Sequence, residues 1–121
     1  MRKGITRKMV FDNRLELFAP ITLIDEMRKY YLYVEKKSGM KKDDFARLFT
    51  LILKRIAIEN LESLRSYLAA AKTLTVDEKD EQYAACALAI NAEIWSNDKG
   101  FRTGRVRVWS TEELASWLFK D

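Results

Sequence analysis

Apolar residues recur at the three- and four-residue spacing of an amphipathic helix over several stretches of the chain. Those stretches cover residues 21–38, 41–56 and 60–74, and two more open at Thr75 and Ser110. Thr75 with Glu78 and Ser110 with Glu113 form capping-box patterns, which are typical of helix starts. A basic stretch at the start of the chain predicts a further short helix that stops near Asp12. The chain is therefore predicted to be rich in helix.

Short apolar or alternating runs between the helices predict strands. They lie at residues 15–19, 56–58, 93–96 and 105–109. Pro20 ends the first strand, because proline lacks the N–H of a regular ladder and suits the first turn of the next helix. Helices that alternate with short strands indicate an α/β fold with a mostly parallel central sheet flanked by helices.

The segment from Asp77 to Asp98 combines an acidic helix start, an amphipathic helix, a strand and an acidic turn. In a layered α/β fold a helix that feeds a strand runs antiparallel to it, so the start of the helix lies beside the end of the strand. We therefore expect Asp80 to lie close to Asp98. By the same reasoning, Glu26 in the helix after the first strand should lie near the carboxyl end of that strand.

Carboxylates gathered at the carboxyl edge of a sheet favour a hard divalent cation such as Mg²⁺ or Mn²⁺. Each of these acids also has a purely structural explanation. Asp77 and Asp80 suit the positive end of a helix. Asp98 suits a turn that ends at Gly100, and Glu26 suits the polar face of its helix. The residues alone leave both interpretations open.

The amino-acid composition limits the kinds of domain, catalytic group and partner that the chain can have. The 121 residues suffice for one compact domain, residues 1–121, with a sizeable core. The chain has no histidine, which excludes histidine triads and ordinary zinc sites and leaves carboxylates as the catalytic material. The single cysteine, Cys86, lies in an apolar run, so we expect a buried thiol and a cytoplasmic setting. No apolar run reaches the roughly 18 residues of a membrane span. The net charge of +4 is compatible with a polyanionic partner.

Three segments of the chain resemble the PIN-domain ribonucleases, in particular the group related to VapC-type toxins. They are RLELFAPITLIDEM, DEKDEQYAACALAINAEIWSND and VRVWSTEEL. The resemblance extends from about Ile5 to Leu118. It implies a PIN-like three-layer fold and a metal-dependent endoribonuclease that hydrolyses phosphodiesters through metal-activated water. It further implies Mg²⁺ or Mn²⁺ as cofactor, RNA as substrate and an antitoxin protein as a candidate partner.

The resemblance also assigns roles to particular residues. The catalytic, metal-binding carboxylates are expected to be Glu26, Asp80 and Asp98. The expected supporting residues are Asp77, Ser96 and Asn97. The nearest candidates for phosphate contacts are the cations Lys29, Lys79, Lys99 and Arg102.

The chain departs from the family pattern near its start. Family members open with a central strand that ends in an aspartate and is followed by a helix, and no room for both lies before residues 15–19. The letters VFDN at residues 10–13 have a superficial likeness to that strand, with Asp12 in the place of its aspartate, but no crossover helix follows. Gly100 also stands where many relatives have another acid.

The predicted fold is therefore an N-terminally shortened PIN domain with two exposed inner strand edges. Exposed edges invite pairing, so the two halves either close on each other or borrow a strand from another copy in a homo-oligomer. Three hypotheses for function remain. The chain is an active nuclease, a catalytically impaired PIN-like module that binds RNA or protein, or a truncated fragment of an active nuclease.

Overall fold

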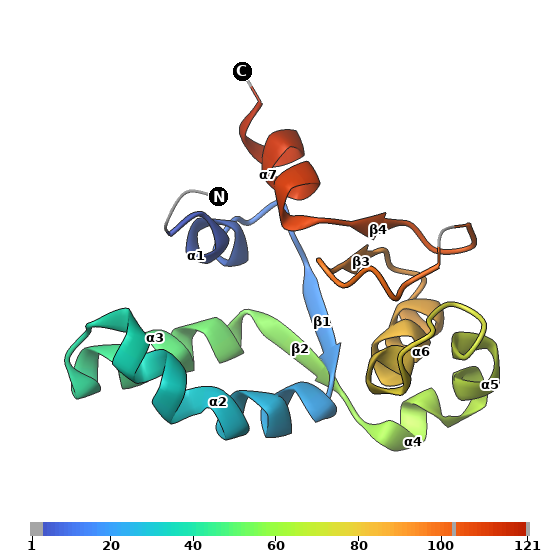
Figure 1. Cartoon of the computed structure of the whole chain (residues 1–121), viewed down its shortest axis with the longest axis horizontal. Helices are drawn as coiled ribbons and strands as arrows, with labels where there is room; N and C mark the ends of the chain where they lie inside the picture. Colours follow the sequence, from blue (N-terminus) through green and yellow to red (C-terminus); the bar gives the residue numbers. More distant parts are fainter. Residues whose placement is uncertain (1–3, 103, 121) are drawn as a thin grey trace.

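The structure is a computed structural model that describes residues 4–102 and 104–120. Helices dominate, and short strands lie between them (Figure 1). The α-helices are α1 (Ile5–Val10), α2 (Thr22–Ser38), α3 (Lys42–Lys54), α4 (Leu61–Leu64), α5 (Leu68–Ala71), α6 (Glu81–Ile90) and α7 (Thr111–Phe119). Two 3-10 helices are η1 (Arg65–Tyr67) and η2 (Glu78–Asp80). The strands are β1 (Leu17–Pro20), β2 (Ile56–Glu59), β3 (Ile94–Trp95) and β4 (Val108–Trp109). The predicted α/β class is confirmed.

The strands of the described residues form two separate parallel pairs, β1 with β2 and β3 with β4. Strands β1 and β3 thus do not pair with each other in the part of the chain that the structure describes. The alternative that the two halves close directly on each other is wrong. Helix α6 contacts both β1 and β3, and its diameter of about 10 Å spans roughly two strand spacings. One helix therefore covers both small sheets and leaves a space between them.

The remaining helices lie around this centre. In Figure 1, α2 and α3 form a hairpin that extends to one side, whereas α4 and α5 lie beside α6 on the other. Helices α1 and α7 contact each other although they come from opposite ends of the chain. Helices α2 and α3 meet through Tyr31, whose ring contacts Phe45 and Phe49 edge-on at centroid distances of 5.1 and 4.9 Å.

Two apolar clusters hold these elements together. The larger one centres on α6, whose small buried side chains allow close approach of its neighbours. Its buried members are Leu64, Ala71, Leu74, Ala84, Ala85, Cys86, Ala87, Ile94 and Val106. The smaller cluster joins α1 to α7 through Met9, Leu114 and Leu118. Cys86 is buried as expected, and burial raises the pKa of its thiol to about 11. It therefore acts as a core residue.

Sequence rules for helix ends succeed at Ser110 and fail at Thr75. Ser110 and Glu113 make both hydrogen bonds of the predicted capping box. Thr75 instead forms an antiparallel bridge with Phe101, so the predicted capping box at Thr75 is wrong. The carboxylate of Asp77 caps the following turn by accepting a hydrogen bond from the N–H of Lys79. A tertiary pairing has taken the place of the local cap.

Two predicted elements are shorter or more broken than expected. The strand expected at residues 105–109 is reduced to Val108–Trp109, after a bend at 104–106 in which Gly104 has a φ of 129°. The helix expected at 60–74 is divided into α4, η1 and α5. Its predicted cap is confirmed, because Asn60 Oδ1 accepts from the N–H of Ser63 at 2.9 Å.

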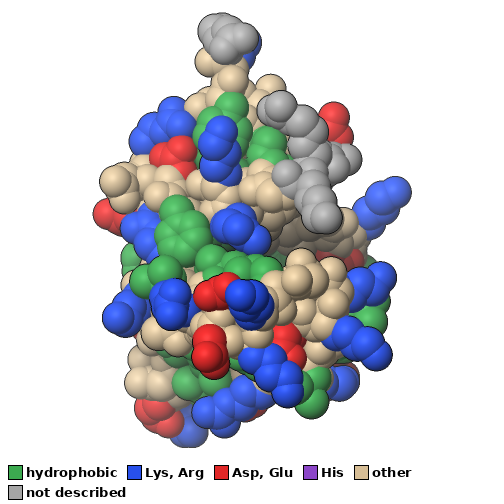
Figure 2. Space-filling model, turned by 90° about the vertical axis from the view of Figure 1, so that its left-hand side faces the viewer, with side chains coloured by type: hydrophobic (Ala, Val, Ile, Leu, Met, Phe, Trp, Pro, Cys, Tyr) green, Lys and Arg blue, Asp and Glu red, His purple; other side chains and the backbone are tan. Residues whose placement is uncertain are grey.

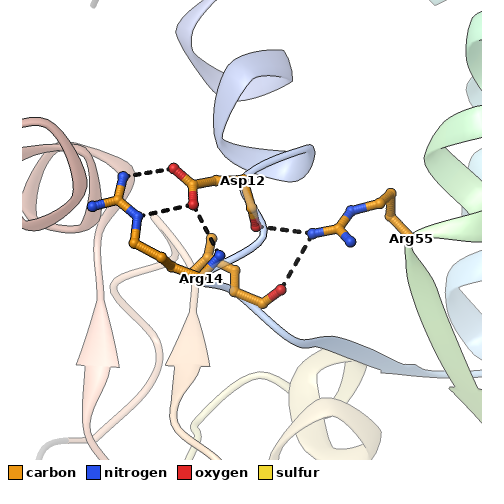
Figure 3. Close-up of polar contacts among 4 residues, drawn as sticks. Asp12, Arg14 and Arg55 are labelled. Carbon is orange, nitrogen blue, oxygen red and sulfur yellow. Dashed lines mark hydrogen bonds and ion pairs between the residues drawn. The ribbon is translucent and has the colours of Figure 1, made fainter.

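Arg55 ties the start of the chain to the end of α3 (Figure 3). Its guanidinium donates to the carbonyl oxygens of Val10, Asp12 and Leu15 at 3.0, 2.8 and 3.3 Å. These carbonyls lie in the connection between α1 and β1, which has no regular structure of its own to satisfy them. Arg55 therefore fixes how the α1 segment enters β1.

We expect Arg55→Met to lower the free energy of unfolding by about 2 kcal/mol, because it leaves three carbonyls without their charged donor. Urea unfolding with an unchanged slope measures this loss. Arg47→Met, on the exposed face of the same helix, is the matched control and should change stability by less than about 0.5 kcal/mol. Equal effects of the two substitutions would contradict the role given to Arg55.

Candidate metal centre

Three carboxylates from two separate loops meet beside the start of α6. Asp77 and Asp80 come from η2 and the residue before it, and Asp98 follows β3. One oxygen of each lies within 4.8 Å of the others. The antiparallel argument from the sequence therefore brings Asp80 to Asp98, as expected.

Backbone hydrogen bonds hold the two loops in register. The N–H of Val76 donates to the carbonyl of Gly100 at 3.0 Å, and the N–H of Arg102 donates to the carbonyl of Leu74. Asp98 Oδ1 accepts from the N–H of Gly100 at 2.8 Å, which closes a tight turn. The loop before η2 and the loop after β3 thus form one unit that presents the carboxylates together.

The carboxylates perturb each other. Burial and the neighbouring Asp98 carboxylate, with a further contribution from Asp77, raise the pKa of Asp80 to about 7. The hydrogen bond to Asp80 and the N–H of Gly100 lower the pKa of Asp98. Two adjacent carboxylates cannot both ionise without cost, so Asp80 keeps its proton to a higher pH than an isolated aspartate, and a bound cation would relieve the same repulsion.

The same residues fit a divalent cation. Oδ2 of Asp80 is buried and has no hydrogen-bond partner among the described residues. A carboxylate with a buried oxygen that lacks a partner is a ready ligand, and an all-oxygen donor set suits Mg²⁺ or Mn²⁺. Asp77, Asp80 and Asp98 are therefore the residues that would hold such an ion.

Glu26 lies near this group without being part of it. The three carboxylates that come within 4.8 Å are Asp77, Asp80 and Asp98. Glu26 instead lines a cavity of about 260 Å³ together with Asp80 and Tyr83. Burial and the charge of Glu26 raise the pKa of the Tyr83 phenol, with a smaller effect from Asp80. Tyr83 thus lies close to both acids.

Sequence reasoning missed Tyr83. Its signal is the spacing from Asp80, because residues three apart project from the same side of a helix. The phenol can donate a hydrogen bond to a carboxylate or to a bound phosphate. Its position makes it the natural link between Glu26 and the aspartate group.

The expected supporting residues have clear structural tasks. Ser96 Oγ accepts from the N–H of Asp98 at 2.9 Å and so shapes the turn that carries this aspartate. Asn97 Oδ1 accepts from the N–H of Thr111 at 2.8 Å, which anchors the same loop to the start of α7. Gly100 leaves room for the site, since a Cβ built there would lie 3.1 Å from Asp98 Oδ1.

The expected phosphate-binding cations are spread around the site. Lys79 Nζ lies 3.7 Å from Asp77 Oδ2. Within the described residues, Lys79 is the one of these four cations that forms an ion pair with an aspartate of the cluster. Lys29 Nζ lies 5.4 Å from the centroid of the Tyr30 ring on α2. Lys99 and Arg102 are exposed, in and after the turn that follows Asp98.

Asp12 serves a different purpose. Its carboxylate forms a salt bridge with Arg14 at 2.7 Å and also accepts from the N–H of Arg14 (Figure 3). These hydrogen bonds lower the pKa of Asp12 to about 2. Among the described residues, Asp12 is not in the group of carboxylates that could hold a metal ion, and it acts as a turn residue.

Comparison with known proteins agrees with this geometry. A family model described as a PIN domain matches residues 1–118. No curated protein and no solved structure matches the chain. The chain therefore belongs to the PIN-domain family, a family of nucleases that generally depend on divalent metals. In the described residues, no helix has both the length and the apolar character needed to cross a membrane.

The raised pKa of Asp80 has a consequence for stability without metal. The folded chain holds a proton on Asp80 up to a pH of about 7, whereas the unfolded chain releases it near 3.8. Stability should therefore fall as the pH rises from about 4 to about 7 and level off above. Because Asp80 is only partly buried and water screens its charge, we expect a fall on the order of 1–2 kcal/mol, less than the full shift would give. Asp98 acts in the opposite sense only at lower pH, because its pKa is lowered.

Urea unfolding in a chelator between about pH 4.5 and 8, which covers most of this window and the plateau above it, measures this fall. Asp80→Asn should flatten the profile, and Asp25→Asn, in the first turn of α2, should leave it unchanged. A sloping profile in Asp80→Asn would show that another group is responsible.

Proposed function

We propose that this chain is a Mg²⁺- or Mn²⁺-dependent endoribonuclease of PIN type that acts in the cytoplasm. The observation that carries the proposal is the meeting of the Asp77, Asp80 and Asp98 carboxylates within 4.8 Å, together with a buried oxygen of Asp80 that has no hydrogen-bond partner among the described residues. Family membership supports the nuclease class and RNA as the partner. Because the chain has no histidine, its carboxylates are the obvious catalytic groups, and a metal held by them would neutralise charge and activate water.

Each residue has a separate task in this proposal. A bound divalent cation supplies Lewis-acid polarisation of the phosphodiester and lowers the pKa of a water molecule. Asp80 and Asp98 hold that cation, with Asp77 as the third carboxylate. Glu26, next to Tyr83 in the adjoining cavity, serves as a base or as a ligand once substrate is bound. Tyr83 orients Glu26 and donates to the phosphate.

Surface charge supports RNA as the partner. The face at the α2–α3 side of the molecule carries many Lys and Arg side chains, with apolar side chains and a smaller number of Asp and Glu side chains among them (Figure 2). Lys79, Lys99 and Arg102 are exposed cations in the two loops that bear the aspartates. They are the side chains we propose for phosphate contacts near the scissile bond, with Lys29 further along α2.

We expect purified chain to cleave single-stranded RNA when Mn²⁺ or Mg²⁺ is present and to stop when a chelator removes it. Asp80→Asn and Asp98→Asn should each lower the cleavage rate by roughly 100-fold or more, because each removes a carboxylate ligand. Calorimetric titration with Mn²⁺ in the absence of RNA should show a comparable loss of metal affinity in both variants. Asp25→Asn is the matched control and should cleave like the unaltered chain.

A binding module without turnover is the second candidate. Two observations favour it. Position 100 is a glycine and supplies no carboxylate, and Glu26 lies outside the cluster of Asp77, Asp80 and Asp98. Under this alternative, RNA is retained without metal, retention weakens steeply with salt, and no cleavage depends on Asp80. Equal cleavage by the unaltered chain and by both aspartate variants would identify a contaminating nuclease and count against the enzyme.

The proposal extends to a toxin that an antitoxin protein restrains, and to a homo-oligomer. Expression of an RNA-cleaving chain in a bacterial cell should slow growth, and Asp98→Asn should restore it at equal protein level. Growth that slows equally with both chains would reject cleavage as the cause. Sedimentation of the purified chain tests the oligomer.

A further inference from the structure

The outer face of α2 combines lysine and tyrosine side chains. Five exposed residues fall within about 120° around the helix axis, since each residue turns the helix by about 100°. We call this set the α2 stripe, and its members are Lys29, Tyr30, Tyr33, Lys36 and Lys37. Tyr30 is 52% exposed and Tyr33 is 62% exposed, so both phenol rings have a free surface.

Each tyrosine of the stripe has a lysine beside it. Lys29 Nζ lies 5.4 Å from the centroid of the Tyr30 ring, and Lys37 Nζ lies 5.6 Å from that of Tyr33. No lysine of the stripe forms an ion pair with a carboxylate in the part of the chain that the structure describes. An incoming phosphate can therefore be bound without breaking an existing pair. A flat ring next to a cation suits a nucleotide, which has a flat base and a charged phosphate.

The basic excess of the chain is concentrated around the stripe. Residues 28–42 contain six Lys or Arg and one Glu, a net charge of +5, whereas the whole chain has a net charge of +4. The rest of the chain therefore sums to −1. Figure 2 shows many Lys and Arg side chains on this side of the molecule. The dipole of α2 explains Lys36 and Lys37 in its last turn, but it does not explain Lys29. The segment is complementary to a polyanion.

The stripe begins one helical turn from the acid that borders the metal centre. Glu26 lies three positions before Lys29 and four before Tyr30, so it projects from the same side of α2. Glu26 also lines the cavity of about 260 Å³ that Asp80 lines. From Glu26 to Lys37 the helix rises by about 16 Å, because each residue adds about 1.5 Å. A strand that enters this cavity is thus led onto the stripe.

An unpaired strand fits the stripe better than a duplex or a protein. Bases in a duplex stack on each other and hide their faces, whereas unpaired bases can stack on exposed tyrosine rings. A helix face that docks on a protein is commonly a continuous apolar row, and here each ring is next to a lysine. Leu32 and Val34 are also exposed on α2, but they lie on opposite sides of the stripe and do not make such a row.

We propose that the α2 stripe is a binding surface for single-stranded RNA, with bases stacked on Tyr30 and Tyr33 and phosphates bound by its lysines. The inference rests on the proposed function, because the strand is the substrate of the proposed nuclease. It adds a place where that strand is held outside the carboxylate cluster. Binding at the stripe needs no metal, since rings and lysines supply the contacts, and it tolerates many sequences, since every base has a face that can stack.

The first test measures binding of the full chain to a fluorescent uridine strand of about 12 nucleotides, in a chelator that prevents cleavage. Tyr30→Leu combined with Tyr33→Leu should weaken binding by roughly 10-fold or more, because leucine is apolar but offers a base no ring. Tyr30→Phe combined with Tyr33→Phe keeps both rings and should bind within about 2-fold of the unaltered chain. Tyr67→Leu, at an exposed position in η1, is the matched control and should bind normally.

The second test measures how binding depends on salt. Lys29→Gln combined with Lys37→Gln should reduce the slope of log affinity against log salt by about 1.4, because each phosphate neutralised on a single strand contributes about 0.7. Lys54→Gln combined with Lys72→Gln removes the same charge from exposed positions at the end of α3 and after α5. This control pair should leave the slope unchanged.

Three outcomes would overturn the proposal. The leucine variant binds the strand like the unaltered chain, or the phenylalanine variant loses as much affinity as the leucine variant. Alternatively, the tyrosine substitutions change the sedimentation of the chain but not its affinity for RNA, which would assign the stripe to a contact between copies.

Failure of the proposed nuclease gives a different result. A chain that binds RNA through the stripe but cleaves none with Mn²⁺ would reject the nuclease and keep the stripe. A chain that cleaves RNA, and whose leucine variant binds the strand with unaltered affinity, would reject the stripe alone.

Discussion

Asp80 and Asp98 are close enough that both cannot be ionised at low cost, and much of the chemistry of this chain depends on that repulsion. The proton on Asp80 and a divalent cation are alternative ways to relieve it. The two loops that carry the aspartates are joined by backbone hydrogen bonds and cannot simply move apart. A rigid cluster of like charges that the fold does not neutralise by itself is typical of a metal site, and it gives the family membership a physical basis.

The order of helix and strand made the meeting of Asp80 and Asp98 predictable. The directions in which the Glu26 and Tyr83 side chains point did not follow from the sequence. Asp80 and Asp98 could be placed together because a helix and the strand after it must run antiparallel. Glu26 lines the adjoining cavity and does not join the aspartates. Its distance from Asp80 depends on how α2 is rotated about its axis, and the packing of α2 against α3 sets that rotation. Tyr83 was missed because aromatic residues in helices are ordinarily read as core. Thr75 was assigned as a cap because local rules do not see its partner, Phe101, twenty-six positions away.

The separation of the sheet into two halves has a similar explanation. The sequence indicated strands and a missing central one, but not whether the halves would meet. They stay apart because α6 packs against both β1 and β3, and closing the space would require this helix to leave one of them. The strand expected at 105–109 is short for a related reason, since its partner β3 offers only Ile94 and Trp95 for pairing.

Helix α6 borders both the candidate metal centre and the space between the two small sheets. Its first turn bears Tyr83, three positions after Asp80, while Cys86, Ala87 and Ile90 on the same helix line the cavity between β1 and β3. A small shift of this helix would therefore change the surroundings of Asp80 and the width of that cavity at the same time. The packing of small side chains along α6 thus sets both the distance between the two sheets and the position of the acid at its start.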